Sequence, residues 1–410
     1  MFTSRSPTNL IPWRKLMKSR KSLAVIATAA SALIFSAVPA YAETLNGSGA
    51  TFALPLIDAC KVDFAKDSGH TINYPGGGSG KGRTDFAAGL VDFAGSDAPY
   101  TSGAPAADTF VYAPIYAAPL AVMYNLPTVK EPIYLSPSTI AQIFSGYITN
   151  WDDALIAADN ERVVKTPIYK TQKVTTTVKG KKVTKTVPLL DKKGQAIVAS
   201  YDTKTVNIDL PKQQITVWYR TDSSGSSENF TRFLKGANAG ANERLWPKTQ
   251  SSTFANATPN NITTFFNFQG ASGSAAVAAG VAGKVGSITY SELSFATDNK
   301  LAVANVKNAA GEFVAPSAAG TSIFLGGGTI NDDGTVSVDF VKSLPGGYPI
   351  GTTSYGLAYT SGKSAAKQAA VKEWFTYVLD KCASKYPEKG FAQITGPLAT
   401  KAKEQIAKIK

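Results

Sequence analysis

Four short stretches rich in glycine, serine and threonine interrupt this chain and strongly constrain its fold. They are GSGATF at 47–52, GGGSGKG at 76–82, GSDAP at 95–99 and RTDSSGSS at 220–227. Each lies beside a predicted strand or helix, which is where α/β proteins place their ligand-binding loops. We therefore expect an α/β fold whose site is formed by loops at the carboxyl ends of strands.

Predicted strands and helices alternate along the chain. Strands are expected at 71–74, 90–93 and 215–219, and the apolar run 113–124 fits a buried parallel strand. Five other stretches show the period of a helix: 55–66, 136–145, 226–234, 275–282 and 365–381. This mixed order supports the α/β assignment.

The first 42 residues predict export. Basic residues precede an apolar run from Leu23 to about Val38, which ends in the small-x-small cleavage signal AYA at 40–42. The run is shorter than the roughly 20 residues that span a bilayer, and no cysteine follows it to carry a lipid anchor. We therefore interpret 1–42 as a signal peptide and expect a periplasmic protein, with secretion as the alternative.

The basic character of the chain is local. The whole chain has 42 Lys and Arg against 29 Asp and Glu, and residues 1–42 hold six of the basic residues and none of the acidic ones. The remainder therefore has 36 basic and 29 acidic residues, a net charge of +7. Residues 162–209 alone hold eleven basic and three acidic residues, a net charge of +8. Because a nucleic-acid-binding protein spreads its basic residues over a binding face, we expect no nucleic-acid partner.

The segment 170–188, KTQKVTTTVKGKKVTKTVP, is rich in threonine and valine and turns at Gly180. This pattern predicts a β-hairpin with lysines on its exposed face. It is either a docking patch for an acidic partner or a solvated insertion whose lysines protect an open strand edge. The second interpretation is the simpler one.

Cys60 and Cys382 are the only cysteines, and both fall on apolar helical faces. They are either two buried small apolar residues or, in an oxidising compartment, a disulfide between the N-terminal and C-terminal helices. The sequence leaves both interpretations open. His70 is the only histidine, and without a cluster of Cys and His we expect no metal site and no cofactor.

The glycine-rich stretches predict binding of a small anion. Gly47 and Gly49 allow close approach of the backbone, and Thr51 and Phe52 stand just before a predicted helix, whose free N–H groups attract anions. The stretch at 76–82 lacks the Ser or Thr that a GxxxxGK[ST] phosphate loop requires after its lysine.

The fourth stretch is the most specific. Arg220 ends a predicted strand, and Ser224, Gly225 and Ser226 open the helix that follows, so a guanidinium, two hydroxyls and helix amides converge. Asp222 is positioned to brace the guanidinium. Taken alone, this loop could equally be a helix cap beside a surface charge.

Asp97 suggests which anion is selected. A carboxylate beside an anion site repels its ligand unless the ligand has a proton to donate. Phosphate carries that proton at neutral pH and sulfate does not, so Asp97 would favour phosphate. In isolation, Asp97 could instead be an ordinary turn or cap residue.

Together these motifs resemble those of the phosphate-binding proteins of bacterial ABC-type phosphate uptake systems. The chain has GSGATF, GGGS, VDFAGSDAP, ITNWDD at 148–153, RTDSSGSSENF and YPIGTTSYGL at 348–357, in the family's order. The resemblance implies a two-lobed periplasmic binding protein of type II. Each lobe would be a mixed sheet flanked by helices, with the ligand in the cleft between the lobes.

The resemblance also implies the domain boundaries. The first lobe would comprise 43–117 plus 346–410 and the second 118–345, with a basic, hairpin-like insertion at about 162–212 that has no counterpart in the family. Two lobes agree with the length, because about 368 residues after the leader exceed one ordinary core. The N-terminal and C-terminal helices would then share a lobe, which favours pairing of Cys60 with Cys382.

The resemblance assigns ligand contacts by motif. The implied phosphate ligands are Thr51, Phe52 through its main-chain N–H, Ser79, Asp97, Arg220, Ser224, Gly225 and Ser226, with Asp222 as the partner of Arg220. Ser226 stands where threonine is more usual and keeps the hydroxyl. Lys81 stands where small residues are common, so no contact is assigned to it.

The function implied is capture without catalysis. A monomer would bind inorganic phosphate and deliver it to a membrane-embedded ABC permease. One alternative is a secreted or surface phosphate-binding protein whose basic insertion contacts an acidic partner. A phosphatase is the other, but the sequence offers neither a metal cluster nor an activated nucleophile with its base, so we expect no enzyme.

Overall fold

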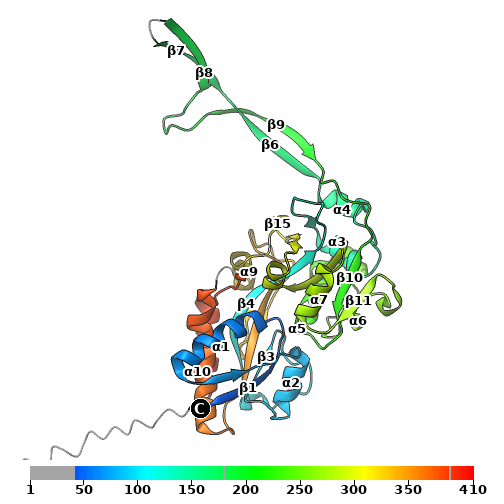
Figure 1. Cartoon of the computed structure of the whole chain (residues 1–410), viewed down its shortest axis with the longest axis vertical. Coiled ribbons are helices and arrows are strands. Elements are labelled where there is room, and N and C mark those ends of the chain that lie inside the picture. The colour runs from blue at the N-terminus through cyan, green and yellow to red at the C-terminus, as the bar shows by residue number, and fades with distance from the viewer. Residues whose placement is uncertain (1–41, 179–180, 387–388) are drawn as a thin grey trace, which may run out of the picture. The chain divides into compact units, whose positions relative to one another are not determined.

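A long strand, β4 (Phe110–Tyr124), joins two groups of parallel strands in the computed structural model of this chain. The structure describes residues 42–178, 181–386 and 389–410. The predicted signal peptide lies outside the described residues, apart from residue 42. The mixed sheet and its flanking helices confirm the α/β prediction (Figure 1).

Nine strands form the main sheet. Eight of them follow one another in the order β11 (Phe268–Ala271), β10 (Thr216–Arg220), β12 (Ser287–Glu292), β4, β18 (Gly351–Tyr359), β3 (Phe93–Ser96), β1 (Thr44–Gly49) and β2 (Thr71–Asn73), and β13 (Ala302–Val303) also pairs with β4. β1 runs parallel to β2 and β3, and β10 runs parallel to β11 and β12. Parallel strands align their carboxyl ends, so each group gathers its loops at one edge.

The strand predicted at 113–124 is present and buried, but its predicted parallel pairing is wrong. β4 is antiparallel both to β18, which it pairs through Pro119, and to β12, which it pairs from Leu120 onward. Its side chains are buried along nearly the whole strand. Burial on both faces produces a continuous apolar run whichever way the neighbours point, so the run does not reveal strand direction.

The strand predicted at 90–93 is also displaced. β3 begins only at Phe93, while Leu90 is 73% exposed. The buried strand continues through the small residues Ala94, Gly95 and Ser96, which have low strand propensity and therefore gave no signal.

All five predicted helices are present with small shifts at their ends. The helices are α1 (Leu54–Ser68), α2 (Ser79–Ala87), α3 (Pro137–Phe144), α4 (Ala154–Asp159), α5 (Gly225–Ala237), α6 (Phe254–Ala257), α7 (Ser274–Ala282), α8 (Leu293–Asp298), α9 (Ala318–Gly326), α10 (Ala365–Tyr377) and α11 (Gly396–Ala407). Caps explain several starts: the Ser136 and Ser364 hydroxyls each accept a hydrogen bond from the first turn. Within the described residues, no helix combines the length and apolar character needed to cross a bilayer.

Smaller strands complete the body. β5 (Tyr134–Leu135), β14 (Asn305–Lys307) and β15 (Phe313–Val314) form one small sheet, and β16 (Thr329–Ile330) pairs with β17 (Val336–Ser337). The lobe boundary predicted between 117 and 118 falls inside β4, close to where its partner changes from β18 to β12. The lobe boundaries themselves stay a prediction.

Residues 162–209, which we name the basic arm, form two antiparallel ribbons. β7 (Thr171–Val178) pairs with β8 (Lys181–Pro188), as the threonine and valine pattern of 170–188 predicts. β6 (Arg162–Tyr169) pairs with β9 (Val198–Val206), a pairing that this pattern did not predict. The predicted turn at Gly180 lies outside the described residues. Among the described strands, none of the main sheet pairs with these four.

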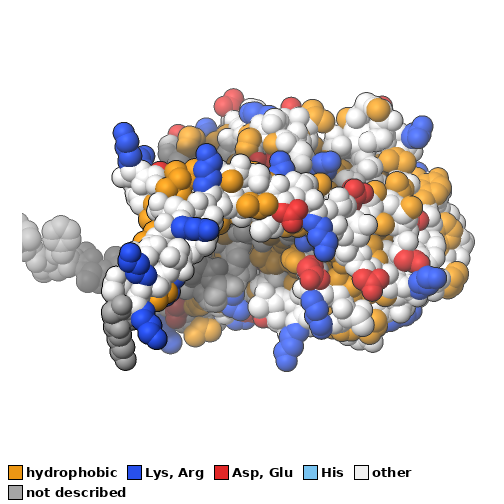
Figure 2. All heavy atoms as spheres, turned by 90° about the horizontal axis from the view of Figure 1, so that it is seen from above, with side chains coloured by type: hydrophobic (Ala, Val, Ile, Leu, Met, Phe, Trp, Pro, Cys, Tyr) orange, Lys and Arg blue, Asp and Glu red, His pale blue; other side chains and the backbone are white. Residues whose placement is uncertain are grey.

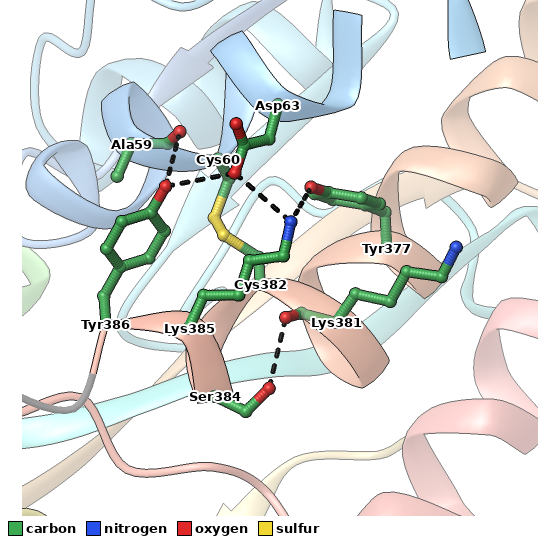
Figure 3. Close-up of a disulfide and its surroundings, with 9 residues drawn as sticks. All are labelled: Ala59, Cys60, Asp63, Tyr377, Lys381, Cys382, Ser384, Lys385 and Tyr386. Atoms are coloured by element: carbon green, nitrogen blue, oxygen red, sulfur yellow. Dashed lines mark hydrogen bonds and ion pairs between the residues drawn. A yellow bond between two sulfur atoms is a disulfide. The ribbon is translucent and has the colours of Figure 1, made fainter. Parts of the chain in front are cut away.

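The structure joins Cys60 on α1 to Cys382, in the π-helical turn that follows α10 (Figure 3). Their Cα atoms are 5.7 Å apart across a sequence separation of 322 residues. Beside the disulfide, Lys385 Nζ donates to Asp63 Oδ2 over 3.2 Å and to the Tyr377 hydroxyl over 3.0 Å. The first and last parts of the chain are therefore held together covalently and by hydrogen bonds.

Candidate functional site

The loops that follow β1, β2 and β3 are hydrogen-bonded to one another. Gly78 N donates to the carbonyl oxygen of Gly49 over 2.7 Å, and Ala50 N donates to that of Gly95 over 2.9 Å. Gly49 has a φ of +136°, and a Cβ there would lie 2.0 Å from the Gly95 carbonyl oxygen, so only glycine fits. This close approach brings three of the predicted loops to one place.

The predicted ligand residues are all buried. They are Thr51, Phe52, Ser79, Asp97, Arg220, Ser224, Gly225 and Ser226. Three helices, α1, α2 and α5, begin at or within three residues of this set, and a fourth, α7, begins at Ser274, whose main-chain N–H donates to Thr51 Oγ1. Because the first turn of a helix has N–H groups without intrahelical partners, the region is rich in donors for an anion.

Asp97 lies at the centre of one half of the site. Its main-chain N–H donates to Ser79 Oγ over 3.1 Å, and Ser354 Oγ donates to its Oδ1 over 2.9 Å. A Cβ on Gly225 would lie 2.5 Å from Ser79 Oγ and 2.8 Å from Asp97 Cβ. The start of α5 therefore packs directly on Ser79 and Asp97, and only glycine permits that contact.

Arg220 organises the other half. Its Nε donates to Asp222 Oδ1 over 2.6 Å, its Nη2 also contacts Asp222, and its Nη1 donates to Ser274 Oγ over 3.0 Å. Ser274 N in turn donates to Thr51 Oγ1 over 3.1 Å. Asp222 thus braces the guanidinium as predicted, and Ser274 links it to the loop after β1.

The hydroxyls at the start of α5 differ in what they contact. Ser224 Oγ accepts a hydrogen bond from Ser227 N over 3.1 Å, so it caps the helix and keeps its own proton to donate. Ser226 Oγ is buried, and it has no hydrogen-bond partner in the described part of the chain. A buried hydroxyl without a partner is costly, so the Ser226 hydroxyl is available to a ligand or a water molecule.

Burial controls the protonation of Asp97. It raises the pKa of the Asp97 carboxyl to about 6, although the hydrogen bond from Ser354 and the charge of Arg220 act to lower it. Burial also acts on Asp222, but the hydrogen bond and charge of Arg220 hold the pKa of that carboxyl below its ordinary value. Of these two carboxyls, Asp222 is matched by Arg220, and Asp97 is the one that gains more from a proton donor.

Two contacts of this site escaped the sequence analysis. Ser354 lies in the recognised stretch YPIGTTSYGL at 348–357, but its position opposite Asp97 was not foreseen. Ser274 opens a predicted helix after the run GASGS at 270–274. That run is the same glycine-serine signal as in the four recognised stretches, and it could have identified Ser274. Lys81, which received no assignment, contacts Asp85 over 2.6 Å.

The comparisons with known proteins identify the family. A sequence model of the PBP superfamily domain matches residues 36–381. The chain is 30% identical over 351 residues to phosphate-binding protein PstS 2 of Mycobacterium tuberculosis (strain ATCC 25618 / H37Rv), covering 80% of this chain and 77% of that relative. The chain belongs to the PstS family of phosphate-binding proteins.

A further relative agrees with the PstS assignment, and two solved structures share the fold. Phosphate-binding protein PstS of Xylella fastidiosa is 26% identical over 342 residues, covering 82% of this chain and 77% of that protein. The structure of a high-affinity periplasmic phosphate-binding protein bound with phosphate, PfluDING, superposes with a TM-score of 0.61 at 21% identity, over 88% of this chain and 93% of that one. A phosphate-binding protein of Stenotrophomonas maltophilia superposes with a TM-score of 0.56 at 19% identity, with the same coverage. These similarities confirm that this chain has the fold of the two-lobed phosphate-binding proteins.

Proposed function

We propose that this chain binds inorganic phosphate outside the cytoplasmic membrane and delivers it to a membrane-embedded ABC-type permease. Membership of the PstS family supports the ligand and the partner. The observation that carries the proposal is the burial of Thr51, Ser79, Asp97 and Arg220 together, beside the first turns of four helices. The signal peptide predicted at 1–42 would place the protein in the periplasm, and it would act as a monomer.

Recognition would rest on hydrogen bonds instead of net charge. Arg220, the hydroxyls of Thr51, Ser79, Ser224 and Ser226, and the helix amides of Phe52 and Gly225 would donate to phosphate oxygens. Asp97, ionised above about pH 6, would accept the proton that phosphate still carries at neutral pH. Sulfate would place an oxygen lone pair against that carboxylate, so it would be rejected.

Capture would require the loops to separate and close. Gly80 N donates to the carbonyl oxygen of Ser223 over 2.9 Å, and Asn229 Nδ2 donates to that of Asp97 over 2.6 Å. These bonds join the loops after β2 and β3 to the start of α5, across the predicted cleft. They would open to admit phosphate and re-form around it, as in hinge closure of periplasmic binding proteins. No covalent step is involved, so we propose binding without catalysis.

Calorimetric titration of Ser226→Ala tests the proposal. Ser226 Oγ has no protein partner among the described residues, so its removal should leave the fold intact while phosphate loses one donor. We expect tight binding of phosphate and none of sulfate by the parent, and a loss of affinity of about tenfold or more in the variant.

Ser322→Ala is the matched control, because that exposed hydroxyl bonds only to the carbonyl of Ala318 in its own helix. It should bind phosphate as the parent does. Absence of phosphate binding by the parent, or equal affinities of the parent and Ser226→Ala, would contradict the proposal.

A further inference from the structure

The basic arm, residues 162–209, contributes no residue to the phosphate site. We propose that the arm binds the anionic surface of a lipid bilayer. The arm would hold the protein beside the membrane. The further statement that this position serves delivery to a permease rests on the proposed function. Binding of phosphate and binding of lipid are separate properties, so each can fail without the other.

The charge of the mature chain is concentrated on the arm. The arm has eleven basic and three acidic residues, whereas the rest of residues 43–410 has 25 basic and 26 acidic ones. The arm therefore has a net charge of +8 and the body a net charge of −1. Attraction to an anionic surface would act almost entirely through the arm, over about one Debye length.

The basic arm also exposes apolar side chains. Ten of the eighteen large exposed apolar residues in the described part of the chain lie on the arm, which is a small part of its length. Tyr201 is 56% exposed and Ile168 is 49% exposed. Figure 2 shows basic side chains (blue) along the arm with apolar side chains (orange) between them. Exposed apolar side chains between basic ones are the pattern of a surface that inserts at a membrane interface.

The strand register sets apolar and basic side chains opposite each other. Val174 pairs with Lys185 across β7 and β8, and Val164 pairs with Lys204 across β6 and β9. Side chains directly opposite each other in an antiparallel pair lie on the same face. Such a face can insert valine methyl groups among lipid chains while the lysine ammonium groups extend to the lipid phosphates.

Two features favour a bilayer over an acidic protein. The exposed apolar and basic side chains are spread along the length of the arm, with the apolar ones on one face of β7 and β8 and on both faces of β6 and β9. They do not gather in one compact cluster, which is the usual form of a protein-binding hot spot. Tyr169 and Tyr201 are also exposed, and tyrosine is enriched at the level of lipid headgroups. In addition, an isolated two-stranded ribbon is only marginally stable in water, so a supporting surface would stabilise the arm.

Flotation with lipid vesicles tests the inference on the phosphate-loaded mature chain. We expect binding to vesicles containing phosphatidylglycerol, weakening as salt is added, and little binding to vesicles of phosphatidylcholine alone. Combined replacement Lys181→Gln, Lys182→Gln and Lys185→Gln should lower partitioning by about a hundredfold. The pair Val174→Thr and Val183→Thr keeps β-branched residues in the strands and should lower it by about tenfold.

The matched control replaces the exposed body lysines, as Lys66→Gln, Lys248→Gln and Lys284→Gln. This variant removes the same charge and should partition as the parent does. The proposal is overturned if the parent does not bind anionic vesicles at low salt, or if the body variant loses as much binding as the arm variant. It is also overturned if the valine replacements have no effect while the lysine replacements abolish binding, because a purely ionic contact would point to an acidic protein or polymer.

Phosphate titration of every variant separates this inference from the proposed function. All variants should bind phosphate like the parent, because none of the replaced residues belongs to the site. Failure of the parent to bind phosphate would overturn the proposed function and leave the vesicle result standing.

Discussion

Asp97 is the residue that would decide which oxyanion the site accepts. It is 3% exposed, and its carboxylate receives hydrogen bonds from Ser354 and Ser79. Replacing it as Asp97→Asn removes the repulsion of a fully ionised ligand, so sulfate should compete with phosphate more effectively than in the parent. Competition binding measures this, with the exposed Asp108→Asn as the control. Equal rejection of sulfate by Asp97→Asn and the parent would show that Asp97 is not the selective element.

The pH dependence of sulfate binding follows from the same carboxyl. Its pKa is raised by burial to about 6, so it is ionised and repels sulfate above that pH. Below it the carboxyl is protonated and can donate a hydrogen bond. Sulfate affinity should therefore rise as the pH falls through about 6, and Asp97→Asn should lack this rise. Titrations at about pH 5 and about pH 8 measure the difference; a flat profile in the parent would contradict the assignment.

At the residue scale, sequence reasoning found the groups that lie in recognisable loops and missed those defined only by contact. Arg220 with Asp222 is a local pair, two residues apart, so it could be predicted. Ser354 and Asp97 are 257 residues apart, and Ser274 and Thr51 are 223 apart. No local sequence pattern predicts that residues so far apart in the chain come into contact.

At the element scale, the disulfide ties α1 to the turn after α10. It closes a very long loop, so in the chain-entropy account it stabilises mainly by restricting the unfolded chain. The double replacement Cys60→Ser and Cys382→Ser should lower the free energy of unfolding by about 2–5 kcal/mol.

Urea denaturation measures this stability change, and calorimetry should show unchanged phosphate affinity, because neither cysteine belongs to the proposed site. The exposed pair Ser322→Ala and Ser384→Ala serves as the control for a double substitution. An unfolding midpoint equal to that of the parent would show that the bond contributes little.

The elements themselves were predictable to different degrees. Helical periodicity located all five predicted helices, since one apolar face recurs every three to four residues. The direction of β4 could not be predicted. Both of its faces are buried, so its sequence lacks the alternation of apolar and polar residues that is typical of an antiparallel strand with one solvated face. The predicted range of β3 was displaced, because its buried residues Ala94, Gly95 and Ser96 are small and carry no strand signal.

At the scale of the whole molecule, loops from two groups of parallel strands come together at the candidate site. β1, β2 and β3 supply one set of loops and β10 supplies another, and β4 with β18 connects them. The bonds from Gly80 to Ser223 and from Asn229 to Asp97 join the two sets. The family resemblance implies a phosphate site in a cleft between two lobes, which stays a prediction, whereas the residues alone predict only that several loops bind one anion.

A crystal structure of residues 43–410 with phosphate tests the central claim most directly. We predict one phosphate held by Thr51, Ser79, Arg220 and Ser226, with one of its oxygens within hydrogen-bonding distance of the Asp97 carboxylate. Phosphate bound elsewhere, or bound among these residues with Asp97 turned away from it, would contradict the account.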